Sequence, residues 1–496
     1  MSSNTHSQTA TASGAGPVRP PNSEDPASAR RSSGRRDGFA ALHYANYRYF
    51  FIGQLPSVVG IWMQTLALSW LVLSTLNGSA LDLGLVNALN FGPVLLFGLY
   101  AGVVADRVNK RDLVNLTQAV NLTLAAAQAV LIIVDRASLH QVFAFALVLG
   151  IANAFNQPAR QAMTSELIDR KDLLNAVSLN AAVFNVGRVV GPSIAGILIW
   201  QFGPAVCFAI NAGCYAFGLF MFRKIRLTFI APPRAHDSVQ KLQEGLRFVR
   251  RTESVLLPTL LIGFVATFAM NFNVWIPLLA TENFGLGSGG LGLLTAGLGV
   301  GSLLGALNLA FSRTRPTRRR LYVSAIILGG VEIVLAIVSS SALPLLVVVL
   351  VLAIAGFFMS TTTASANTIV QGCAPDALRG RVMSVYMTVF TGTIPIGSLL
   401  TGALAESYGA PVAIGLGGVV AGLAAVAILI WREGFSLRPS VRPDVPSIDD
   451  VVASTVPPAA KPLRTASLAG SAQRLAPTPR LDREATAYAA PEANED

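Results

Sequence analysis

The sequence predicts an all-α polytopic membrane protein with twelve transmembrane helices arranged as two six-helix repeats. Three observations predict this class. The 496-residue chain is 52% hydrophobic but only 13% charged, about half of the charged share of an ordinary globular domain. Long apolar runs recur along the chain, and each is close to the roughly 20 residues that cross a bilayer. Sliding the chain against itself brings glycines of the two halves into register.

The composition excludes several other classes of protein. So few charges cannot cover the surface of a soluble protein, and the apolar content excludes a wholly disordered chain. Three cysteines in 496 residues exclude a disulfide scaffold. A net charge of +11 could indicate nucleic-acid binding, but basic residues of membrane proteins collect on cytoplasmic loops, and we favour that interpretation.

The apolar runs lie between two polar tails. The predicted spans are 48–76, 82–105, 113–134, 140–163, 175–200, 204–223, 255–281, 289–311, 321–340, 343–370, 382–406 and 410–431. The domain organisation is therefore an N-terminal six-helix bundle at 39–223, a cytoplasmic linker at 224–254 and a C-terminal six-helix bundle at 255–431. Residues 1–38 and 432–496 lack apolar periodicity, and we expect disordered cytoplasmic tails there.

The distribution of basic residues predicts how the spans are oriented. The breaks after the odd-numbered spans hold a single basic residue, Arg136, whereas those after the even-numbered spans are strongly basic. Because cytoplasmic loops are enriched in Lys and Arg, both termini are expected on the cytoplasmic side of the cell (inner) membrane. The basic residues in or next to the even-numbered breaks include Arg107, Lys110, Arg111, Arg170, Lys171, Arg223, Lys224, Arg247, Arg250, Arg251, Arg313, Arg315, Arg318, Arg319, Arg320, Arg379 and Arg381.

The longest break is expected to contain a short amphipathic helix. Within residues 238–251, Val239, Leu242, Leu246 and Val249 recur at three- and four-residue spacing. Such a helix is expected to lie at the cytoplasmic membrane surface and to link the two bundles.

Glycines repeat at a fixed spacing between the two halves. A single gapless shift of 206 residues is expected to hold from the second span to the fifth. The pairs that it matches include Gly150 with Gly356, Gly191 with Gly397, Gly196 with Gly402, Gly203 with Gly409 and Arg107 with Arg313. A parallel repeat of two six-helix halves implies a central cavity between halves that rock against each other.

Two motifs carry a resemblance to a known family. The residues Gly102-Val-Val-Ala-Asp106-Arg107-Val-Asn109-Lys110-Arg111 resemble the loop motif G-x-x-x-D-R-x-G-R-R of the major facilitator superfamily. In that family the loop latches the cytoplasmic side, so the resemblance implies a gating motif; a basic loop that only fixes topology is the alternative. Asn109 stands where the family has glycine, and asparagine is the next-best residue for a left-handed turn.

The fifth span carries the second motif. Gly187-x-x-x-Gly191-Pro192-x-x-Ala195-Gly196 resembles the antiporter motif G-x-x-x-G-P-x-x-G-G of the same superfamily, with Arg188 directly after the first glycine. These glycines provide a smooth packing face, and Pro192 removes a backbone donor. The alternative is ordinary small-residue packing. The run Gln157-Pro158-Ala159-Arg160, followed by Glu166, is similar to the branch that contains the enterobactin exporter and macrolide or multidrug efflux proteins.

Two charges lie inside the membrane, where each costs about 2.5–3.5 kcal/mol on insertion scales. Arg188 is half-way along the fifth span. It is expected either to bind an anionic substrate or pair with a carboxylate, or to form a structural hydrogen bond with backbone carbonyls near Pro192. Glu332 is half-way along the ninth span and is the candidate proton carrier. Because the resemblance makes the third, sixth, ninth and twelfth spans an outer scaffold, a protonated structural glutamate is the favoured alternative.

The resemblance also implies that the first, fourth, seventh and tenth spans line a central cavity. Their polar and aromatic side chains are the candidate cavity and substrate residues, with interhelical hydrogen bonding as the alternative role. These candidates are Gln64, Asn153, Asn156, Gln157, Asn271, Asn273, Trp275 and Thr362. Without an acid in the middle of these spans, neutral or anionic cargo is favoured over cationic drugs.

No signature of an enzyme was found. The sequence has no Walker-type phosphate loop, no Cys/His cluster with metal-ligand spacing and no arguable Ser-His-Asp arrangement. We therefore expect no catalytic residues, no metal and no cofactor.

The expected function is secondary active export of small organic molecules by proton antiport and alternating access. The alternatives are a dedicated siderophore exporter, or a transport-inactive membrane scaffold or sensor. The expected partners are a small-molecule substrate, the lipid bilayer and protons, with no nucleic acid and a monomeric chain.

Overall fold

The structure is a computed structural model that describes residues 39–433, apart from residues 170, 227–237, 313–315, 342 and 376–377. Every regular element in this part of the chain is helical. Twelve helical segments are long and apolar enough to cross a membrane. These segments confirm the predicted fold class, and each predicted boundary lies within three residues of an observed one. The predicted tails fall outside the described residues, except that the last helix ends at Glu433.

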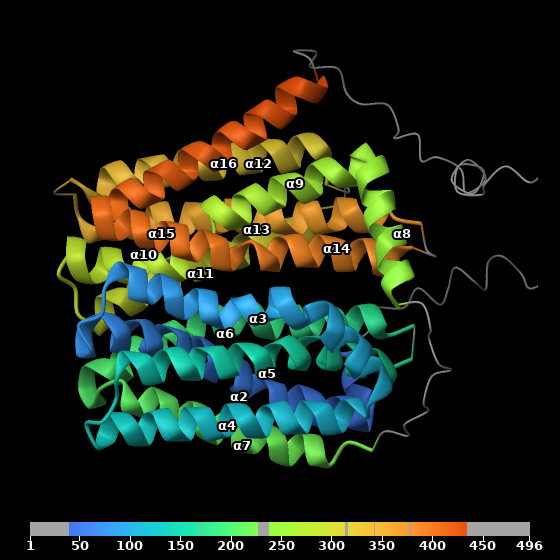
Figure 1. Cartoon of the computed structure of the whole chain (residues 1–496), viewed down its shortest axis with the longest axis horizontal. Helices are drawn as coiled ribbons and strands as arrows, with labels where there is room; N and C mark the ends of the chain where they lie inside the picture. The colour runs from blue at the N-terminus through green and yellow to red at the C-terminus, as the bar shows by residue number, and fades with distance from the viewer. Residues whose placement is uncertain are drawn as a thin grey trace, which may run out of the picture. The chain divides into compact units, whose positions relative to one another are not determined.

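The helices form two halves that Figure 1 shows as neighbouring bundles. The N-terminal half comprises η1 (Ala40–His43), α2 (Ala45–Trp70), η2 (Leu71–Thr75), α3 (Ala80–Arg107), α4 (Lys110–Ile133), α5 (Leu139–Glu166), α6 (Leu173–Phe202) and α7 (Ala205–Arg223). The linker helix α8 (Ser238–Arg251) follows. The C-terminal half comprises α9 (Glu253–Phe268), α10 (Phe272–Leu278), η3 (Leu279–Asn283), α11 (Ser288–Ala310), α12 (Arg318–Ser339), α13 (Leu345–Cys373), α14 (Arg379–Gly392), α15 (Ile394–Tyr408) and α16 (Ala410–Glu433).

Local sequence explains where several helices begin and end. Ser79 and Asp82 form a capping box at the start of α3, because the Ser79 hydroxyl accepts from the Asp82 amide at 3.2 Å while the Asp82 carboxylate accepts from the Ser79 amide at 2.9 Å. Gly203 and Gly409 end α6 and α15 with φ of 78° and 85°. A residue with a Cβ is strained at such angles, so glycine is the natural residue at both positions.

Three spans consist of more than one helical piece, which the sequence did not predict. The first and seventh spans each end in a π turn, η2 and η3. The seventh span is also interrupted between α9 and α10, where the Asn271 side chain donates to the Thr267 carbonyl one turn earlier at 2.6 Å. The eleventh span changes from α14 to α15 at Thr393, two residues before Pro395, which has no backbone N–H to donate.

The predicted repeat recurs as a pair of equivalent contacts between the halves. A Cβ built on Gly196 of α6 would lie 3.2 Å from the Cα of Gly292 in α11, and one built on Gly402 of α15 would lie 3.2 Å from the Cα of Gly84 in α3. Gly196 and Gly402 occupy equivalent positions 206 residues apart. Their partners, Gly84 and Gly292, are 208 residues apart, and so are the starts of η2 and η3. The expectation of one shift from the second span to the fifth is therefore wrong. The second half is two residues shorter between these helices.

The surface of the bundles suits a lipid environment. Large apolar side chains such as Leu96, Trp200 and Trp431 are each more than 70% exposed. Exposed apolar area of this extent on several helices is typical of a membrane-facing surface. We call the end of the bundles that holds the basic loops and α8 the inner end, and the opposite end the outer end.

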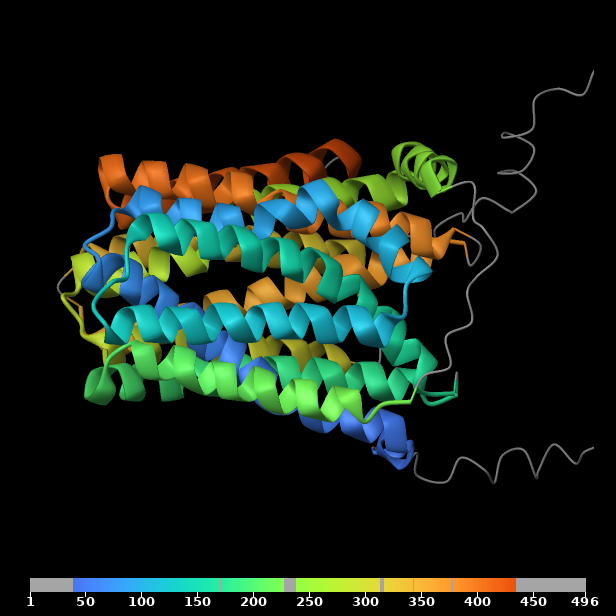
Figure 2. The ribbon, with the colours of Figure 1, turned by 60° about the horizontal axis from the view of Figure 1, so that its bottom comes forward.

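The predicted amphipathic segment coincides with the helix α8, which packs against protein. Figure 1 shows α8 crossing the inner ends of α9 and α14, and Figure 2 shows it at the same end of the helices. Gly245, Phe248 and Val249 are buried there, whereas Leu246 of the predicted apolar stripe is exposed. Glu244 forms an ion pair with Arg381 at the start of α14. The side chains of Val239 and Leu242 lie outside the described residues.

The closest helix contacts generate a stability prediction. A Cβ on Gly301 of α11 would lie 1.7 Å from the Ala353 carbonyl oxygen of α13, so Gly301→Ala forces two backbones apart. We expect this change to lower the free energy of unfolding by about 1–3 kcal/mol. The control is Gly330→Ala on α12, which faces open space and is expected to be neutral or slightly stabilising. Thermal unfolding of the purified proteins in detergent measures both changes. Equal unfolding temperatures for the two variants would contradict the packing described here.

Candidate functional site

A small cavity lies between the two halves, beside the mid-point of α6 and the outer parts of the neighbouring helices. Its walls come from α2 and α6 of the N-terminal half and from α10 and α11 of the C-terminal half. The lining residues are Trp62, Thr65, Leu66, Ser69, Arg188, Pro192, Phe272, Asn273, Ile276, Pro277, Leu291, Thr295 and Leu298. The space open to the centres of water-sized molecules is about 20 Å³, which is room for about one water molecule. The cavity is therefore contracted in this conformation.

Arg188 is the charged residue in the wall of this cavity, and both halves hold it. Its guanidinium carbon lies 5.3 Å from the ring centroid of Trp62 on α2 and 5.3 Å from that of Phe272 on α10. One terminal nitrogen lies 3.9 Å from the sulfur of Met359 on α13. The faces of aromatic rings attract a cation, so these contacts stabilise the charge without a carboxylate.

The antiporter motif lies where α6 packs closely against α2 of its own half and against α11 of the other half. A Cβ on Gly187 would lie 2.7 Å from Val58, and one on Gly191 would lie 2.6 Å from the Cβ of Trp62, so these two glycines permit close packing against α2. Pro192 cannot donate to the Arg188 carbonyl one turn earlier. Gly299 of α11 packs near that carbonyl, since a Cβ there would lie 3.0 Å from its oxygen.

The outer halves of the helices meet at backbone distance. A Cβ on Gly196 would lie 2.9 Å from the Ser288 carbonyl oxygen, and the Ser288 hydroxyl donates to the Gly196 carbonyl at 3.1 Å. On the other side of the interface, the Leu81 amide of α3 donates to the Glu406 carboxylate of α15 at 3.4 Å. These contacts join the two halves between the central cavity and the outer end.

Of the predicted cavity residues, Asn273 lines the central cavity and the other seven lie elsewhere. Gln64 accepts a hydrogen bond from Asn211 of α7 inside the N-terminal half. Asn271 bonds the Thr267 carbonyl and accepts from the Ser398 hydroxyl at 3.3 Å.

The remaining candidates occupy several environments. Trp275 is buried against Phe272 in an edge-to-face contact, and Thr362 donates to the Ser324 hydroxyl at 2.9 Å inside the C-terminal half. Asn156 is buried, and its side-chain oxygen has no hydrogen-bond partner. Asn153 is half-buried and Gln157 is exposed on the same helix, α5. Sequence reasoning missed Phe272 because an aromatic residue in an apolar run carries no signal of its position in the fold.

The candidate proton carrier Glu332 is fully enclosed in the C-terminal half. The residue is 2% exposed, and one carboxylate oxygen has no hydrogen-bond partner. A Cβ on Gly418 of α16 would lie 2.9 Å from the Cβ of Glu332, so this side chain occupies the contact between α12 and α16. Glu332 is absent from the lining of the central cavity.

The gating motif spans the end of α3 and the start of α4. The side-chain surroundings of Gly102 and Asp106 lie outside the described residues, and Arg107 is exposed. Lys110 forms an ion pair with Glu166 of α5 at 2.7 Å, and Arg111 donates to the Arg223 carbonyl of α7 at 2.5 Å. Lys110 and Arg111 therefore join three helix ends within the N-terminal half.

The expected left-handed turn at Asn109 is wrong. Its φ is −62°, and its side-chain oxygen accepts from the Arg111 amide at 3.0 Å. Asn109 thus caps the N-terminus of α4, which needs an acceptor for its first amides rather than an unusual backbone angle.

A second buried cation lies near the inner end of the N-terminal half. The Arg160 guanidinium carbon is 5.3 Å from the Phe222 ring centroid and 5.8 Å from that of Phe50. Two of its nitrogens are enclosed without a hydrogen-bond partner. Arg160 belongs to the run that carries the branch resemblance, so the sequence singled it out without predicting this aromatic environment.

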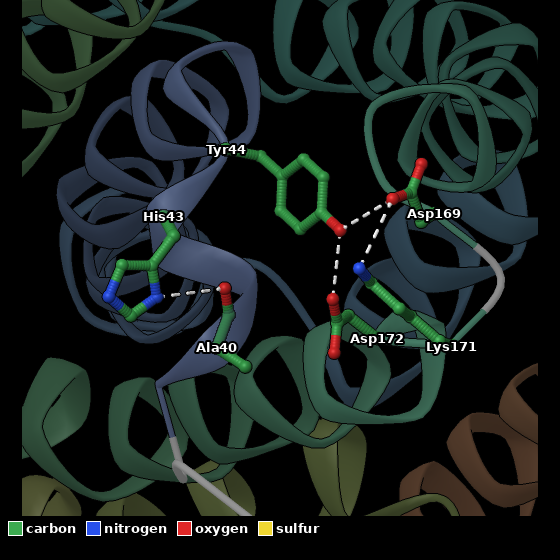
Figure 3. Close-up of polar contacts among 6 residues, drawn as sticks. All are labelled: Ala40, His43, Tyr44, Asp169, Lys171 and Asp172. Carbon is green, nitrogen blue, oxygen red and sulfur yellow. Dashed lines mark hydrogen bonds and ion pairs between the residues drawn. The ribbon is translucent and has the colours of Figure 1, made fainter. Parts of the chain in front are cut away.

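A cluster around Tyr44 joins the start of the first span to the connection between α5 and α6. The Tyr44 hydroxyl lies 2.9 Å from a carboxylate oxygen of Asp169 and 2.8 Å from one of Asp172, and the Lys171 ammonium lies 3.6 Å from the Asp169 carboxylate. Figure 3 shows these residues around the Tyr44 hydroxyl. A phenol has one proton to donate, so it serves one carboxylate at a time. Partial burial and the two carboxylates raise the pKa of Tyr44. No periodicity in the sequence pointed to this cluster.

Comparisons with known proteins identify the family of the chain. A family model described as transmembrane secretion effector matches residues 36–455. The chain belongs to this family of the major facilitator superfamily. It is similar to the multidrug efflux pump Tap of Mycolicibacterium fortuitum, with 31% identity over 72% of this chain and 88% of that protein. Membership of this family makes the protein a membrane transporter and confirms the resemblance inferred from the motifs.

More distant relatives and solved structures agree at lower identity. The staphyloferrin A transporter of Staphylococcus aureus is 24% identical over 73% of this chain and 90% of that protein, and the macrolide efflux protein A of Streptococcus pyogenes is 24% identical over 67% and 83%. The fold is similar to the nucleoside transporter NupG, with a TM-score of 0.62 and 13% identity over 78% of this chain and 98% of that one. An inward-facing, occupied bacterial homologue of Spinster has a TM-score of 0.62 and 16% identity over 81% and 99%.

The Tyr44 cluster generates a testable prediction. In Tyr44→Phe the aromatic ring is kept but its hydrogen bond to Asp169 and Asp172 is lost, so the start of α2 and the α5–α6 connection should open locally more often. We expect several-fold faster backbone hydrogen exchange at residues 44–50 and 167–172, measured by mass spectrometry. The control is Tyr49→Phe on the same helix, whose hydroxyl has no hydrogen bond in the structure. Equal protection in the two variants would argue against a bracing role for Tyr44.

Proposed function

We propose that the protein is a secondary active exporter of small organic molecules that works by proton antiport and alternating access. The observation that carries this proposal is the way in which the halves meet. Paired glycines bring α6 onto α11 and α15 onto α3 at backbone distance, and the contracted cavity lies directly inward of these contacts. Rocking of one repeat against the other about a central site requires an interface of this kind.

The contacts support an inward-facing state with a closed outer gate. The glycine contacts between the halves lie from the middle of the membrane to the outer end. In the opposite state we propose that Gly102, Asp106, Arg107, Lys110 and Arg111 latch the inner end, as their resemblance to the gating motif implies.

Glu332 is the proposed proton carrier. A carboxyl group buried in the membrane is neutral unless it is paired, and one oxygen of Glu332 has no hydrogen-bond partner. A structural role at the α12–α16 contact is the alternative. The outward direction of transport is supported by the similar proteins, which include efflux proteins for drugs and for macrolides. The basic inner loops support cytoplasmic termini and a place in the inner membrane.

Two other functions deserve a test. The similarity to the staphyloferrin A transporter favours a dedicated siderophore exporter as the second candidate. A transport-inactive scaffold or sensor that uses its tails is the third, and deletion of residues 1–38 and 434–496 separates it from a transporter. A transporter should keep working without these tails, whereas a scaffold should fail.

Cellular accumulation tests the proposed export. An efflux-deficient bacterium that carries the protein should accumulate less of at least one compound from a panel of dyes, macrolides, tetracyclines and catechol siderophores. A protonophore should abolish the difference. Gly196→Leu, which pushes α6 away from the backbone of α11, should reduce export several-fold at matched membrane levels, whereas the control Gly213→Leu on α7 faces open space and should not. Export that survives the protonophore, or that Gly196→Leu leaves intact, would contradict the proposal.

Cross-linking tests alternating access. Leu81 and Glu406 meet across the outer interface. In a variant whose three cysteines are replaced by serine, Leu81→Cys together with Glu406→Cys should be joined by a short bifunctional thiol reagent. A reducible cross-link should stop export, and a reductant should restore it. The single-cysteine variants are the controls. Full export through the cross-linked protein would rule out opening at this interface.

A further inference from the structure

We infer that the central cavity recognises an anionic oxygen of the cargo, a carboxylate above all, and that Arg188 is the residue that binds it. This inference rests on the proposed export function and names the substrate class of that site: organic acids with an aromatic or apolar body.

The first argument is the missing counter-charge. Arg188 is half-way along α6, and the residues that line the cavity include no Asp or Glu. No carboxylate of the described residues lies within 4.0 Å of its guanidinium group. A cation at this depth is expensive unless a partner accompanies it, and such residues mark substrate or ion pathways. The cavity itself is where a partner would lie.

The second argument is the geometry of the guanidinium contacts. Trp62 and Phe272 provide ring contacts at 5.3 Å, and Met359 provides a sulfur, which is a weak acceptor. None of the five N–H donors bonds an oxygen of the described residues. Contacts with ring faces leave the planar edge of a guanidinium available, and that edge matches a carboxylate in a bidentate arrangement.

The third argument is an excess of donors around the cavity. The indole N–H of Trp62 is enclosed without a hydrogen-bond partner. The hydroxyls of Thr65, Ser69 and Thr295 donate to carbonyls of their own helices, so they offer acceptors alone to a ligand. Among the described lining residues, N–H donors without a bond to an oxygen are therefore found on Arg188, on Trp62 and on the side-chain amide of Asn273, which also carries an acceptor oxygen. The remaining wall is mostly apolar, which suits an apolar body.

The fourth argument separates Arg188 from the packing of the repeat. The shift of 206 residues pairs Gly191 with Gly397 and Gly196 with Gly402, and these glycines make equivalent helix contacts. At the same shift, Arg188 corresponds to Ile394. The C-terminal half thus packs in the same way without a cation, so the charge is not needed for the architecture and belongs to the cavity.

The test compares three probes that share one ring and chain and differ in head-group charge. They are 4-(1-pyrenyl)butyrate, 4-(1-pyrenyl)butanol and 4-(1-pyrenyl)butylammonium. Binding to the purified full chain in lipid nanodiscs is followed by pyrene fluorescence. We expect the acid to bind about tenfold or more tightly than the ammonium compound. Arg188→Gln should weaken binding of the acid by about tenfold or more and change that of the alcohol less than about twofold.

Further variants distinguish recognition from a structural role. Arg188→Lys keeps the charge but loses the planar fork, so acid binding should fall between the native protein and Arg188→Gln. Trp62→Phe keeps the ring, removes the indole N–H and should weaken acid binding alone. Unfolding temperatures identify any variant that fails to fold, and the head-group series on the native protein needs no variant. Equal binding of the three probes, no saturable binding of the acid, or unchanged acid binding in Arg188→Gln would overturn the inference.

The two proposals fail in different ways. If cells export a cation or a neutral compound while the purified protein shows no preference for the acid, the exporter stands and the anion site does not. If the purified protein selects the acid while cells export none of the panel, the anion site stands and the proposed export function does not.

Discussion

The architecture depends on backbone-to-backbone contact between the two halves. Gly84 against Gly402 and Gly196 against Gly292 bring helices closer than any side chain would allow. In a bilayer, lipid tails are as apolar as leucine, so close van der Waals packing of small residues replaces the hydrophobic effect as the force that joins helices. Such a contact holds the halves closely when it is closed, and only a few polar groups, such as the Ser288 hydroxyl and the Glu406 carboxylate, lose a partner when it opens. A repeated interface of this kind suits two halves that separate and rejoin.

The central cation can be tolerated because this interface surrounds it. Closure of the outer halves keeps Trp62 of one half and Phe272 of the other within 5.3 Å of the Arg188 guanidinium. If the halves separate at the outer end, at least one of these rings must move away from the charge. In the proposed exporter, the aromatic contacts would stabilise the closed outer end, and a cargo anion would offer the charge another partner during opening. Binding and gating would then share one residue.

The sequence predicted the spans, the repeat and the position of Arg188, because these depend on local composition and on spacing along the chain. It could not predict which polar residues meet the cavity. Asn271 and Asn273 are two residues apart, yet the break between α9 and α10 directs Asn271 to its own helix and to Ser398, while Asn273 lines the cavity. Helical periodicity fails where a helix is interrupted. The two-residue change in the repeat was hidden because Gly84 meets a glycine at either shift, Gly290 at 206 residues and Gly292 at 208.

The proposed proton carrier and the proposed anion site lie in different places, so any coupling between them must pass through packed helices. Met359 of α13 contacts Arg188, and one turn later Thr362 of the same helix bonds Ser324 of α12. Glu332 lies further along α12, against Gly418 of α16. Helix α13 therefore contacts α12, the helix that holds Glu332, and also contacts Arg188 in the wall of the cavity. A change at Glu332 that shifts α12 can reach Arg188 through α13 without a direct charge interaction, which is the kind of contiguous connection that coupling between distant sites requires.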